Sequence, residues 1–316
     1  MPAKRTPTAT SSKGKRARGR SDRTGHPFAP TCCSPDAFDL MAAQVAGRSN
    51  KEPRLATSDG LVAAACAVAL QLDPNVEPQD CLKALEQLAK EAAAPLGGID
   101  AARRRAAANP QAVVAHLHRS LFDVAGFAGN DIDYYRIDNS SLPAALSTRR
   151  GLPITLAMVY KLVASRLGLR SWGVGLPGHF VAGVEAGGAM LVDCFDGGRI
   201  LDRDDARERV AACAGPDVPF NDDLLRPVSH RHWVTRLMQN LLQVLDADGR
   251  HADVAAILEL ELLLWPEEAH LARDLGLVLA RIGQGRPAKG WLTHYLDSRP
   301  DDPQNGDLRD LVQALA

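Results

Sequence analysis

The stretch TRRGLPITLAMVYKLVASRLGL, residues 148–169, predicts the helix around which this chain folds. Pro153 suits its first turn, because the N–H that proline lacks has no partner there and its φ is already helical. The apolar positions at helical spacing are Ile154, Met158, Leu162, Val163 and Leu167. They form a wide apolar face, and Gly168 ends the helix. The sequence therefore predicts a central buried helix that begins at Pro153.

A second stretch, SWGVGLPGHFVAGVEAGGAMLVDCF over residues 171–195, predicts β-structure. Its valine, phenylalanine and leucine content favours strands over 171–185 and 188–195, with Gly187 and Gly188 as the turn between them. A helix followed by antiparallel strands is an α+β arrangement. The predicted fold class is therefore α+β, with a central helix packed on a small antiparallel sheet.

His179 and Asp193 lie an even number of residues apart across this predicted hairpin. A register centred near Ala186 would place them opposite each other on one face of the sheet. A carboxylate that holds a histidine fixes its tautomer and makes it a tuned acid or base. The alternative is a structural histidine, hydrogen-bonded to the backbone beside the turn at Pro177 and Gly178, and the spacing alone favours this alternative.

A catalytic histidine also needs a nucleophile. A cysteine at the start of the central helix would suit, because the helix dipole and the free N–H groups stabilise a thiolate, but no cysteine stands there. Thr155 lies two residues into the helix, where capping or packing is the expected role. Cys194 adjoins Asp193, but successive side chains of a strand point to opposite faces, so we expect it to point away from His179.

Three further residues lie within or near these stretches. Arg150 comes just before the central helix and would add positive charge there, although a solvated arginine is the simpler interpretation. Tyr135 lies in a loop rich in Asp and Asn, residues 128–146, and is a second candidate for the edge of a cleft. Cys213 follows a predicted helical segment and is expected to be a small buried residue.

Upstream of the central helix, residues 36–125 predict helices. The segments 59–73, 78–98 and 109–127 each combine apolar residues at helical spacing with Pro or Gly at their ends. Asp59 is the expected N-cap of the first. The six cysteines show no CxxC spacing and no histidine partners, which indicates reduced thiols, and neither a metal site nor a cofactor is predicted.

Residues 1–23 are strongly basic, with eight Lys and Arg against one Asp, whereas the remaining residues carry a net charge of −8. A polar, basic segment cannot bury enough apolar surface to fold, so the range 1–35 is predicted to be disordered. It would bind nucleic acid only non-specifically, and a solvated tail is the favoured interpretation. Neither a secretory signal nor a membrane-spanning segment is present, so a cytoplasmic location is expected.

From about residue 233 the chain predicts helices that repeat at an offset of 34 residues. The matched pairs are Leu241 and Leu275, Leu245 and Leu279, Gly249 and Gly283, Leu258 and Leu292, Leu262 and Leu296, and Pro266 and Pro300. This period is typical of tetratricopeptide (TPR) repeats, in which each helical hairpin hides its apolar face by stacking on a neighbour.

The stretches NDIDYYRIDNSSLPAALSTRRGLPITLAMVYKLVASRLGL, GVGLPGHFVAGV and VDCFDGG together closely resemble the SirB-type proteins. These form a bacterial branch of the transglutaminase-like superfamily, with a related module in an animal F-box protein. The resemblance covers roughly residues 59–300. It implies a papain-like transglutaminase core followed by TPR-like helices. The expected units are a tail (1–35), a helical part (36–130), the core (131–228) and the repeats (229–316).

In that superfamily the nucleophilic cysteine opens the helix that ends in Leu-Gly, at the position of Pro153 here. The family's histidine and aspartate match His179 and Asp193. The resemblance therefore implies a non-catalytic scaffold that binds a protein or peptide through the core cleft and the repeats. The alternative is a peptidase or acyltransferase with a relocated nucleophile, Cys194 or Thr155. Association of the basic tail with nucleic acid is a weaker third possibility.

Overall fold

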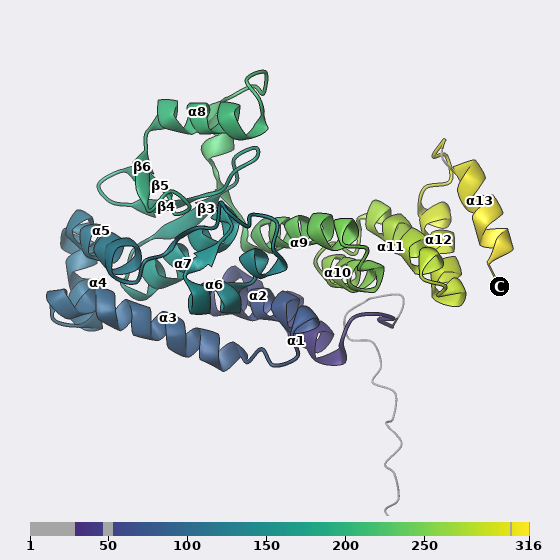
Figure 1. Cartoon of the computed structure of the whole chain (residues 1–316), viewed down its shortest axis with the longest axis horizontal. Helices are drawn as coiled ribbons and strands as arrows, with labels where there is room; N and C mark the ends of the chain where they lie inside the picture. Colours follow the sequence, from purple (N-terminus) through teal and green to yellow (C-terminus); the bar gives the residue numbers. More distant parts are fainter. Residues whose placement is uncertain (1–28, 47–52, 304, 316) are drawn as a thin grey trace, which may run out of the picture.

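The computed structural model describes residues 29–46, 53–303 and 305–315 of the chain. They form a mostly helical molecule with one small antiparallel sheet, so the predicted α+β class is confirmed (Figure 1). Within these ranges, no helix is both long and apolar enough to cross a membrane. The basic segment 1–23 lies outside the described residues, and its disorder stays a prediction.

The first part of the chain is helical, as expected. Its elements are α1 Pro35–Val45, η1 Arg54–Ala56, α2 Ser58–Leu72, α3 Pro78–Ala93, η2 Ala94–Leu96, α4 Ile99–Ala108, α5 Pro110–His118 and the π-helix η3 Arg119–Val124. The N-cap of α2 is Thr57 and not Asp59, because the Thr57 hydroxyl accepts the N–H of Gly60 at 3.0 Å. Helix α4 was not predicted as a separate element, since its run of Ala and Arg has no apolar stripe.

The end of the predicted tail is anchored on helix α10, His251–Leu264. The buried carboxylate of Glu259 accepts the main-chain N–H groups of Thr31 at 2.6 Å, Cys32 at 3.0 Å and Cys33 at 2.6 Å. A buried carboxylate requires donors of this kind. The predicted disordered range 1–35 therefore extends too far.

The main sheet has five antiparallel strands in the order β6-β5-β4-β3-β7. They are β3 Ser171–Val174, β4 Val181–Glu185, β5 Ala189–Asp193, β6 Arg199–Leu201 and β7 Pro227–Val228. The single strand expected over 171–185 is wrong: β3 and β4 are separate strands that pair with each other. Gly178, at φ +69°, allows the chain to reverse between them.

The central helix α7, Pro153–Arg166, begins where the sequence predicts. It follows η4 Ile137–Ser140, α6 Leu142–Thr148 and a short parallel ladder between β1 Ala128–Gly129 and β2 Arg150–Gly151. All of its residues from Pro153 to Ala164 are buried. The helix is therefore the centre of the molecule.

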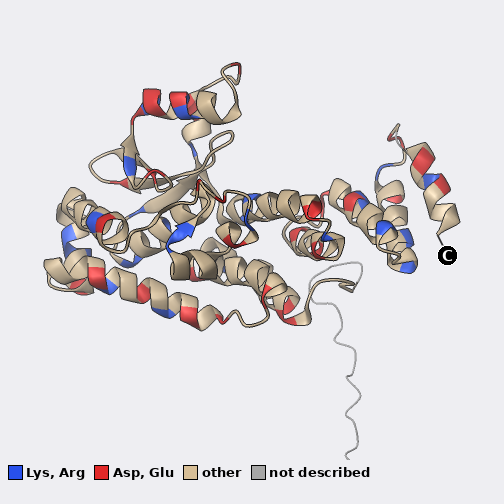
Figure 2. Cartoon of the chain, in the orientation of Figure 1, with Lys and Arg blue, Asp and Glu red and all other residues tan. Residues whose placement is uncertain are grey.

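Two helices cover the two faces of the sheet. Ala182, Val184 and Val192 belong to the large core that contains α7, whereas Val181 and Leu191 pack with α8, Arg203–Ala214. Figure 1 shows α8 across the sheet from α7. Acidic and basic side chains are mixed along the first half of α8 (Figure 2), which is typical of a solvated outer helix.

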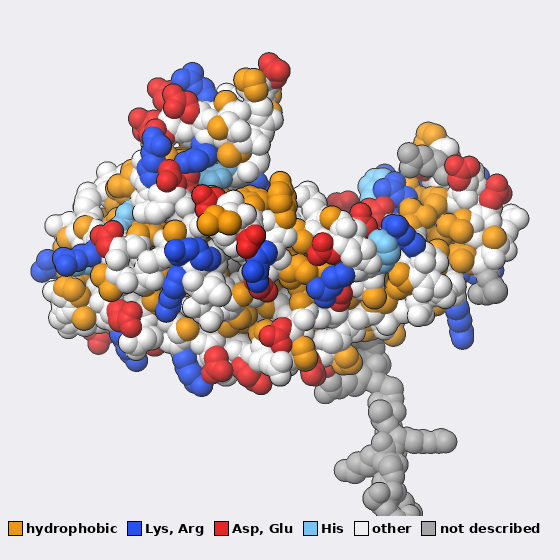
Figure 3. Space-filling model, viewed as in Figure 1, with side chains coloured by type: hydrophobic (Ala, Val, Ile, Leu, Met, Phe, Trp, Pro, Cys, Tyr) orange, Lys and Arg blue, Asp and Glu red, His pale blue; other side chains and the backbone are white. Residues whose placement is uncertain are grey.

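The last part of the chain packs helix on helix in chain order and extends away from the sheet (Figure 1). Its elements are η5 Asp222–Leu225, α9 His230–Ala247, α10, α11 Ala269–Arg281, α12 Gly285–Ser298 and α13 Asn305–Ala314. The matched Gly249 and Gly283 both follow a helix with positive φ, 70° and 77°. Hydrophobic side chains gather over α12 and α13 (Figure 3). That these helices are TPR repeats stays a prediction.

Candidate functional site

His179 and Asp193 are in contact, so the carboxylate-held histidine is observed and not the backbone-bonded histidine that the spacing alone favoured. The imidazole Nε2 lies 2.9 Å from Asp193 Oδ2, and the two side chains are 5% and 0% exposed. The expected register is wrong by one residue, because the pairing of Glu185 with Ala189 centres the hairpin on Gly187. His179 therefore lies before strand β4 and reaches Asp193 diagonally.

Asp193 also has partners other than His179. Its Oδ2 also accepts from Arg209 of α8 at 3.0 Å, and its Oδ1 accepts the main-chain N–H groups of Phe195 at 3.1 Å and Asp196 at 3.3 Å. Burial by itself raises the pKa of Asp193, but its bonds to His179 and the charges of His179 and Arg209 outweigh this and hold that pKa below its usual range. The carboxylate is therefore ionised and fully engaged.

Cys194 points away from this pair, as predicted. Strand alternation sends Leu191 and Asp193 toward α8, and Val192 and Cys194 toward α7. The thiol is 1% exposed, and its Sγ contacts the carbonyl of Val192 at 3.8 Å. Burial, with the charge of Asp193, raises the pKa of Cys194 well above the usual range of a thiol.

The Thr155 hydroxyl is also directed away from His179, toward the loop before α7. Its hydroxyl is fully buried and donates to the main-chain carbonyl of Asn139 at 2.8 Å. That carbonyl also accepts the N–H of Leu152, just before α7, at 2.9 Å. In the part of the chain that the structure describes, no hydrogen bond joins His179 to Thr155 or to Cys194. Thr155 thus fastens the start of α7 to the preceding loop.

Pro153 occupies the first turn of α7 and is buried. Trp233 of α9 connects this turn with the segment just before β4, which carries His179. Its indole Nε1 donates to the carbonyl of Ile154 at 3.2 Å, and its ring packs on Phe180, with 4.8 Å between ring centroids. The residue after Pro153 and the residue after His179 therefore touch the same side chain.

Arg236 of the same helix holds the turn that carries His179. Its guanidinium donates to the carbonyls of Leu176 at 2.6 Å and His179 at 2.8 Å, and it lies over the ring of Phe180. Helix α9, assigned to the repeats by the boundary at residue 229, thus forms one wall of the candidate site. That boundary itself stays a prediction.

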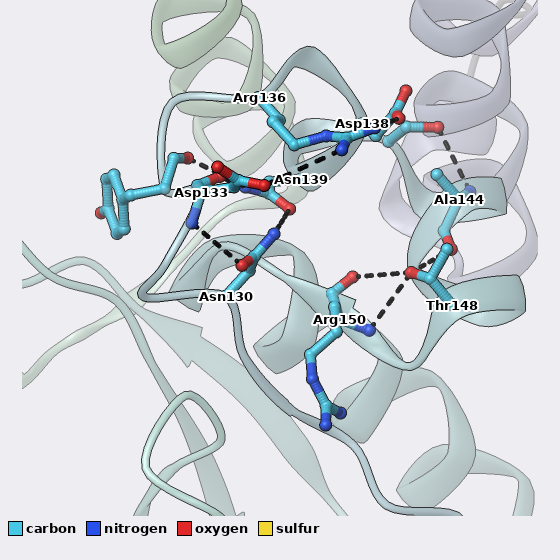
Figure 4. Close-up of polar contacts among 10 residues, drawn as sticks. Asn130, Asp133, Arg136, Asp138, Asn139, Ala144, Thr148 and Arg150 are labelled. Atoms are coloured by element: carbon cyan, nitrogen blue, oxygen red, sulfur yellow. Dashed lines mark hydrogen bonds and ion pairs between the residues drawn. The ribbon is translucent and has the colours of Figure 1, made fainter.

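Arg150 does not reach the pair through any contact in the described residues. Its Nη1 donates to the carbonyls of Gly126 at 2.7 Å and Arg149 at 3.1 Å, and its side chain points away from the loop that holds Asn130 and Asp133 (Figure 4). Arg149, with φ 61°, turns the chain from α6 into β2. Arg150 therefore braces the approach to α7.

Tyr135 is connected to the pair by aromatic contacts. Its exposed ring meets Tyr134 edge to face at 5.2 Å, Tyr134 meets Phe195 at 6.0 Å, and Phe195 meets His179 at 6.3 Å. Such edge-to-face contacts favour a fixed geometry. The expectation that Tyr135 lies at the edge of the site fits this arrangement.

Cys213 is exposed, and the expectation that it is buried is wrong. It lies at the end of α8 against Gly178, where a methyl group on the glycine would come within 2.9 Å of its Cβ. Partial burial raises the pKa of this thiol, the charge of Arg209 lowers it, and that of Asp193 raises it. A thiol with a raised pKa is a weak nucleophile at neutral pH.

Five residues of the site were not found from the sequence: Asn139, Phe195, Arg209, Trp233 and Arg236. The arrangement holds the imidazole in one orientation, with Nε2 on Asp193 and no partner for Nδ1 among the described residues. It offers a base without an adjacent nucleophile. Nor do any three His, Cys, Asp or Glu side chains in the described ranges group so that they could hold a metal ion.

The sequence profile of the transglutaminase-like superfamily matches residues 79–239 of this chain. A UPF0162 protein of Xylella fastidiosa strain 9a5c is 36% identical over 206 residues, 63% of this chain and 73% of that protein. A UPF0162 protein of Pseudomonas aeruginosa is 29% identical over 189 residues, 60% of this chain and 66% of that protein. Human F-box only protein 21 is 35% identical over 88 residues, 27% of this chain and 14% of that protein. No solved structure matches the chain significantly.

Proposed function

This chain belongs to the transglutaminase-like superfamily, with UPF0162 proteins among its relatives, and on that premise we propose that it is a non-catalytic scaffold that binds a protein or peptide partner. The observation that carries the proposal is Pro153, which supplies no sulfur where the superfamily's nucleophile is expected to open the central helix. Without a thiol at that position no acyl-thioester forms. The SirB-type resemblance and the TPR-like repeats are part of this proposal.

The environment of the pair supports a structural role. Asp193 bonds Arg209 as well as His179, so the carboxylate attaches α8 to the sheet whether or not the histidine takes part in chemistry. A fold does not determine an activity, and a retained His–Asp pair is compatible with a scaffold when the fold depends on it. The partner would contact the surface around the His179 segment and the helices from α9 onward.

The alternative is a peptidase or acyltransferase that uses the pair with a relocated nucleophile. Its support is the contact between His179 and Asp193. Its two candidates are weak, because Thr155 donates to a main-chain carbonyl and Cys194 is buried with a raised thiol pKa. Binding of nucleic acid would depend on the basic segment 1–23, which lies outside the described residues.

An activity test separates the scaffold from the enzyme. The full chain and the His179→Ala variant are incubated with glutamine-containing peptides and a labelled primary amine, and with casein, and products are read by mass spectrometry. We expect no cross-linked, deamidated or cleaved product from either protein. A product that the wild type forms and His179→Ala does not form would establish the enzyme and end the scaffold proposal.

A further inference from the structure

Two large apolar side chains project into solvent from one loop, residues 130–138. Ile132 is 91% exposed and Tyr135 is 77% exposed, the two highest values among the large hydrophobic residues that the structure describes. Single exposed apolar residues are common on protein surfaces. Ile132 and Tyr135, by contrast, lie together on one short loop at the edge of the candidate site.

The loop is held from beneath by a buried asparagine. Asn139 is 3% exposed, and its Nδ2 donates to the carbonyls of Asp133 at 2.7 Å and Tyr134 at 2.9 Å. Its Oδ1 accepts from Asn130 Nδ2 at 3.1 Å, and Asn130 Oδ1 accepts the N–H of Asp133 at 3.2 Å (Figure 4). These bonds fix the backbone around Ile132. The loop therefore presents its side chains in a prepared conformation, which lowers the entropy lost on binding.

The ring of Tyr135 is supported in the same way. Tyr134 packs against it from one side and against Phe195 from the other, and Phe195 contacts His179. An exposed tyrosine on a rigid base is the kind of residue that contributes most to protein interfaces. The loop is thus continuous with the candidate site.

The charge of the loop indicates the chemistry of its partner. Residues 131–138 hold three aspartates and one arginine, a net charge of −2. Arg136 already pairs with Asp138 at 3.0 Å and with Asp133 at 3.9 Å, whereas Asp131 has no ion pair within the described part of the chain. Residues 24–316 carry 29 Lys and Arg against 37 Asp and Glu. The net negative charge of the loop and of this part of the chain favours a basic partner over nucleic acid or an anionic membrane.

We propose that the 130–138 loop is a docking site for a basic protein segment with large apolar side chains, which contact Ile132 and Tyr135 while its Lys or Arg pairs with Asp131 and Asp133. This inference rests on the proposed scaffold function and specifies the partner class for it. From the loop the segment continues over the aromatic residues toward His179.

A peptide library displayed on phage and selected on the immobilised full chain tests the proposal. We expect enriched peptides that combine Lys or Arg with Leu, Ile or Phe. Binding of a synthetic enriched peptide, followed by fluorescence anisotropy, should weaken at least tenfold with Ile132→Ser/Tyr135→Ser. It should weaken severalfold with Asp131→Asn/Asp133→Asn, together with a smaller dependence on salt. The matched control is Val124→Ser, because Val124 is 73% exposed outside the loop and its variant should bind as the wild type does.

The outcomes distinguish this inference from the function on which it rests. Peptides that bind the wild type and the Ile132→Ser/Tyr135→Ser variant equally would overturn the docking site and leave the scaffold function standing. Enrichment of acidic peptides, or loop-dependent binding to anionic vesicles, would overturn the partner class. Absence of any binder to the wild type would count against both. The substituted Ile132 and Tyr135 side chains are exposed, so we expect the variants to fold. An unchanged melting temperature verifies this.

Discussion

The guanidinium of Arg209 lies 3.0 Å from the carboxylate of Asp193, so this aspartate serves as the attachment point of helix α8. The same Oδ2 atom binds His179, and Oδ1 accepts two main-chain N–H groups. A buried carboxylate of this kind is expensive to leave unpaired and stabilising when every lone pair is used. Asp193 therefore stabilises the fold, whether or not it takes part in catalysis.

Asp193→Ala should destabilise the protein strongly, because it leaves Arg209 and the buried His179 without their common partner. We expect a loss of about 3–5 kcal/mol in the free energy of unfolding. Urea unfolding followed by circular dichroism measures it. Asp196→Ala is the matched control, because Asp196 also bonds Arg209 at 3.0 Å but is 52% exposed, and it should cost less than about 1 kcal/mol. Equal effects of the two substitutions would refute the structural role of Asp193.

Pro153→Cys should create a reactive thiol if Pro153 stands at the nucleophile position. A sulfur in the first turn of a 14-residue helix is stabilised as thiolate by the helix dipole, and the imidazole of His179 would add to this if it faces that turn. In a Cys213→Ala background, iodoacetamide should modify the new cysteine about tenfold faster at pH 6.5 than it modifies Cys194 of the same protein, which is also buried. Mass spectrometry locates the adduct.

Adding His179→Ala to Pro153→Cys is the control for that experiment. The rate should fall, because the thiolate loses the imidazole that supports it. An unchanged rate would mean that His179 does not face the start of α7. A Pro153→Cys thiol no more reactive than an ordinary one would remove the premise of the scaffold proposal, that proline replaced a working nucleophile.

The local features of this fold could be predicted from the sequence, and the contacts between distant elements could not. Pro153 marks the start of α7 because its effect acts within one turn. The even separation of His179 and Asp193 across the hairpin placed them on one face of the sheet, and the observed register keeps that parity. The contact itself did not follow from the spacing, which alone favoured a histidine bonded to the backbone. The register of the hairpin could not be predicted, because two adjacent glycines, Gly187 and Gly188, are compatible with more than one turn geometry.

Arg209 and Asn139 show why the rest of the site was missed. Arg209 lies on a helix of mixed charges, where an arginine that pairs with a buried carboxylate looks the same as a solvated one. Asn139 follows Asp138 in a polar loop, which predicts a turn residue and not a buried anchor. In both cases the decisive partner comes from tertiary packing, which no local pattern records.

Cys213 should be the cysteine that reacts first in the native protein, and at the rate of an ordinary thiol. It is exposed, and the factors that raise its pKa leave little thiolate at neutral pH. Cys194, fully buried, should react only on unfolding. Timed labelling with N-ethylmaleimide and peptide mapping checks the order. Fast labelling of Cys194 that is lost in His179→Ala would instead favour the enzyme with a relocated nucleophile.

Glu261 of α10 should make the stability of the protein depend on pH. It is 3% exposed, and Gln239 of α9 donates to it across 3.4 Å. Burial raises the pKa of this carboxyl to about 7, the bond from Gln239 lowers it, and the charge of Asp274 raises it. Between about pH 4.5 and 7 the folded state keeps a proton that the unfolded state has lost, so stability falls as the pH rises through this window.

Glu261→Gln removes this ionisation and keeps a hydrogen-bonding side chain. We expect the variant to be more stable than the wild type by on the order of 2 kcal/mol at pH 8, where the buried carboxylate is charged, and by much less at pH 5. Urea unfolding at the two pH values gives the difference. Glu268→Gln, on an exposed residue just before α11, should change stability by less than about 0.5 kcal/mol at either pH. If the wild type and Glu261→Gln lose the same stability from pH 5 to pH 8, Glu261 is not the group that titrates.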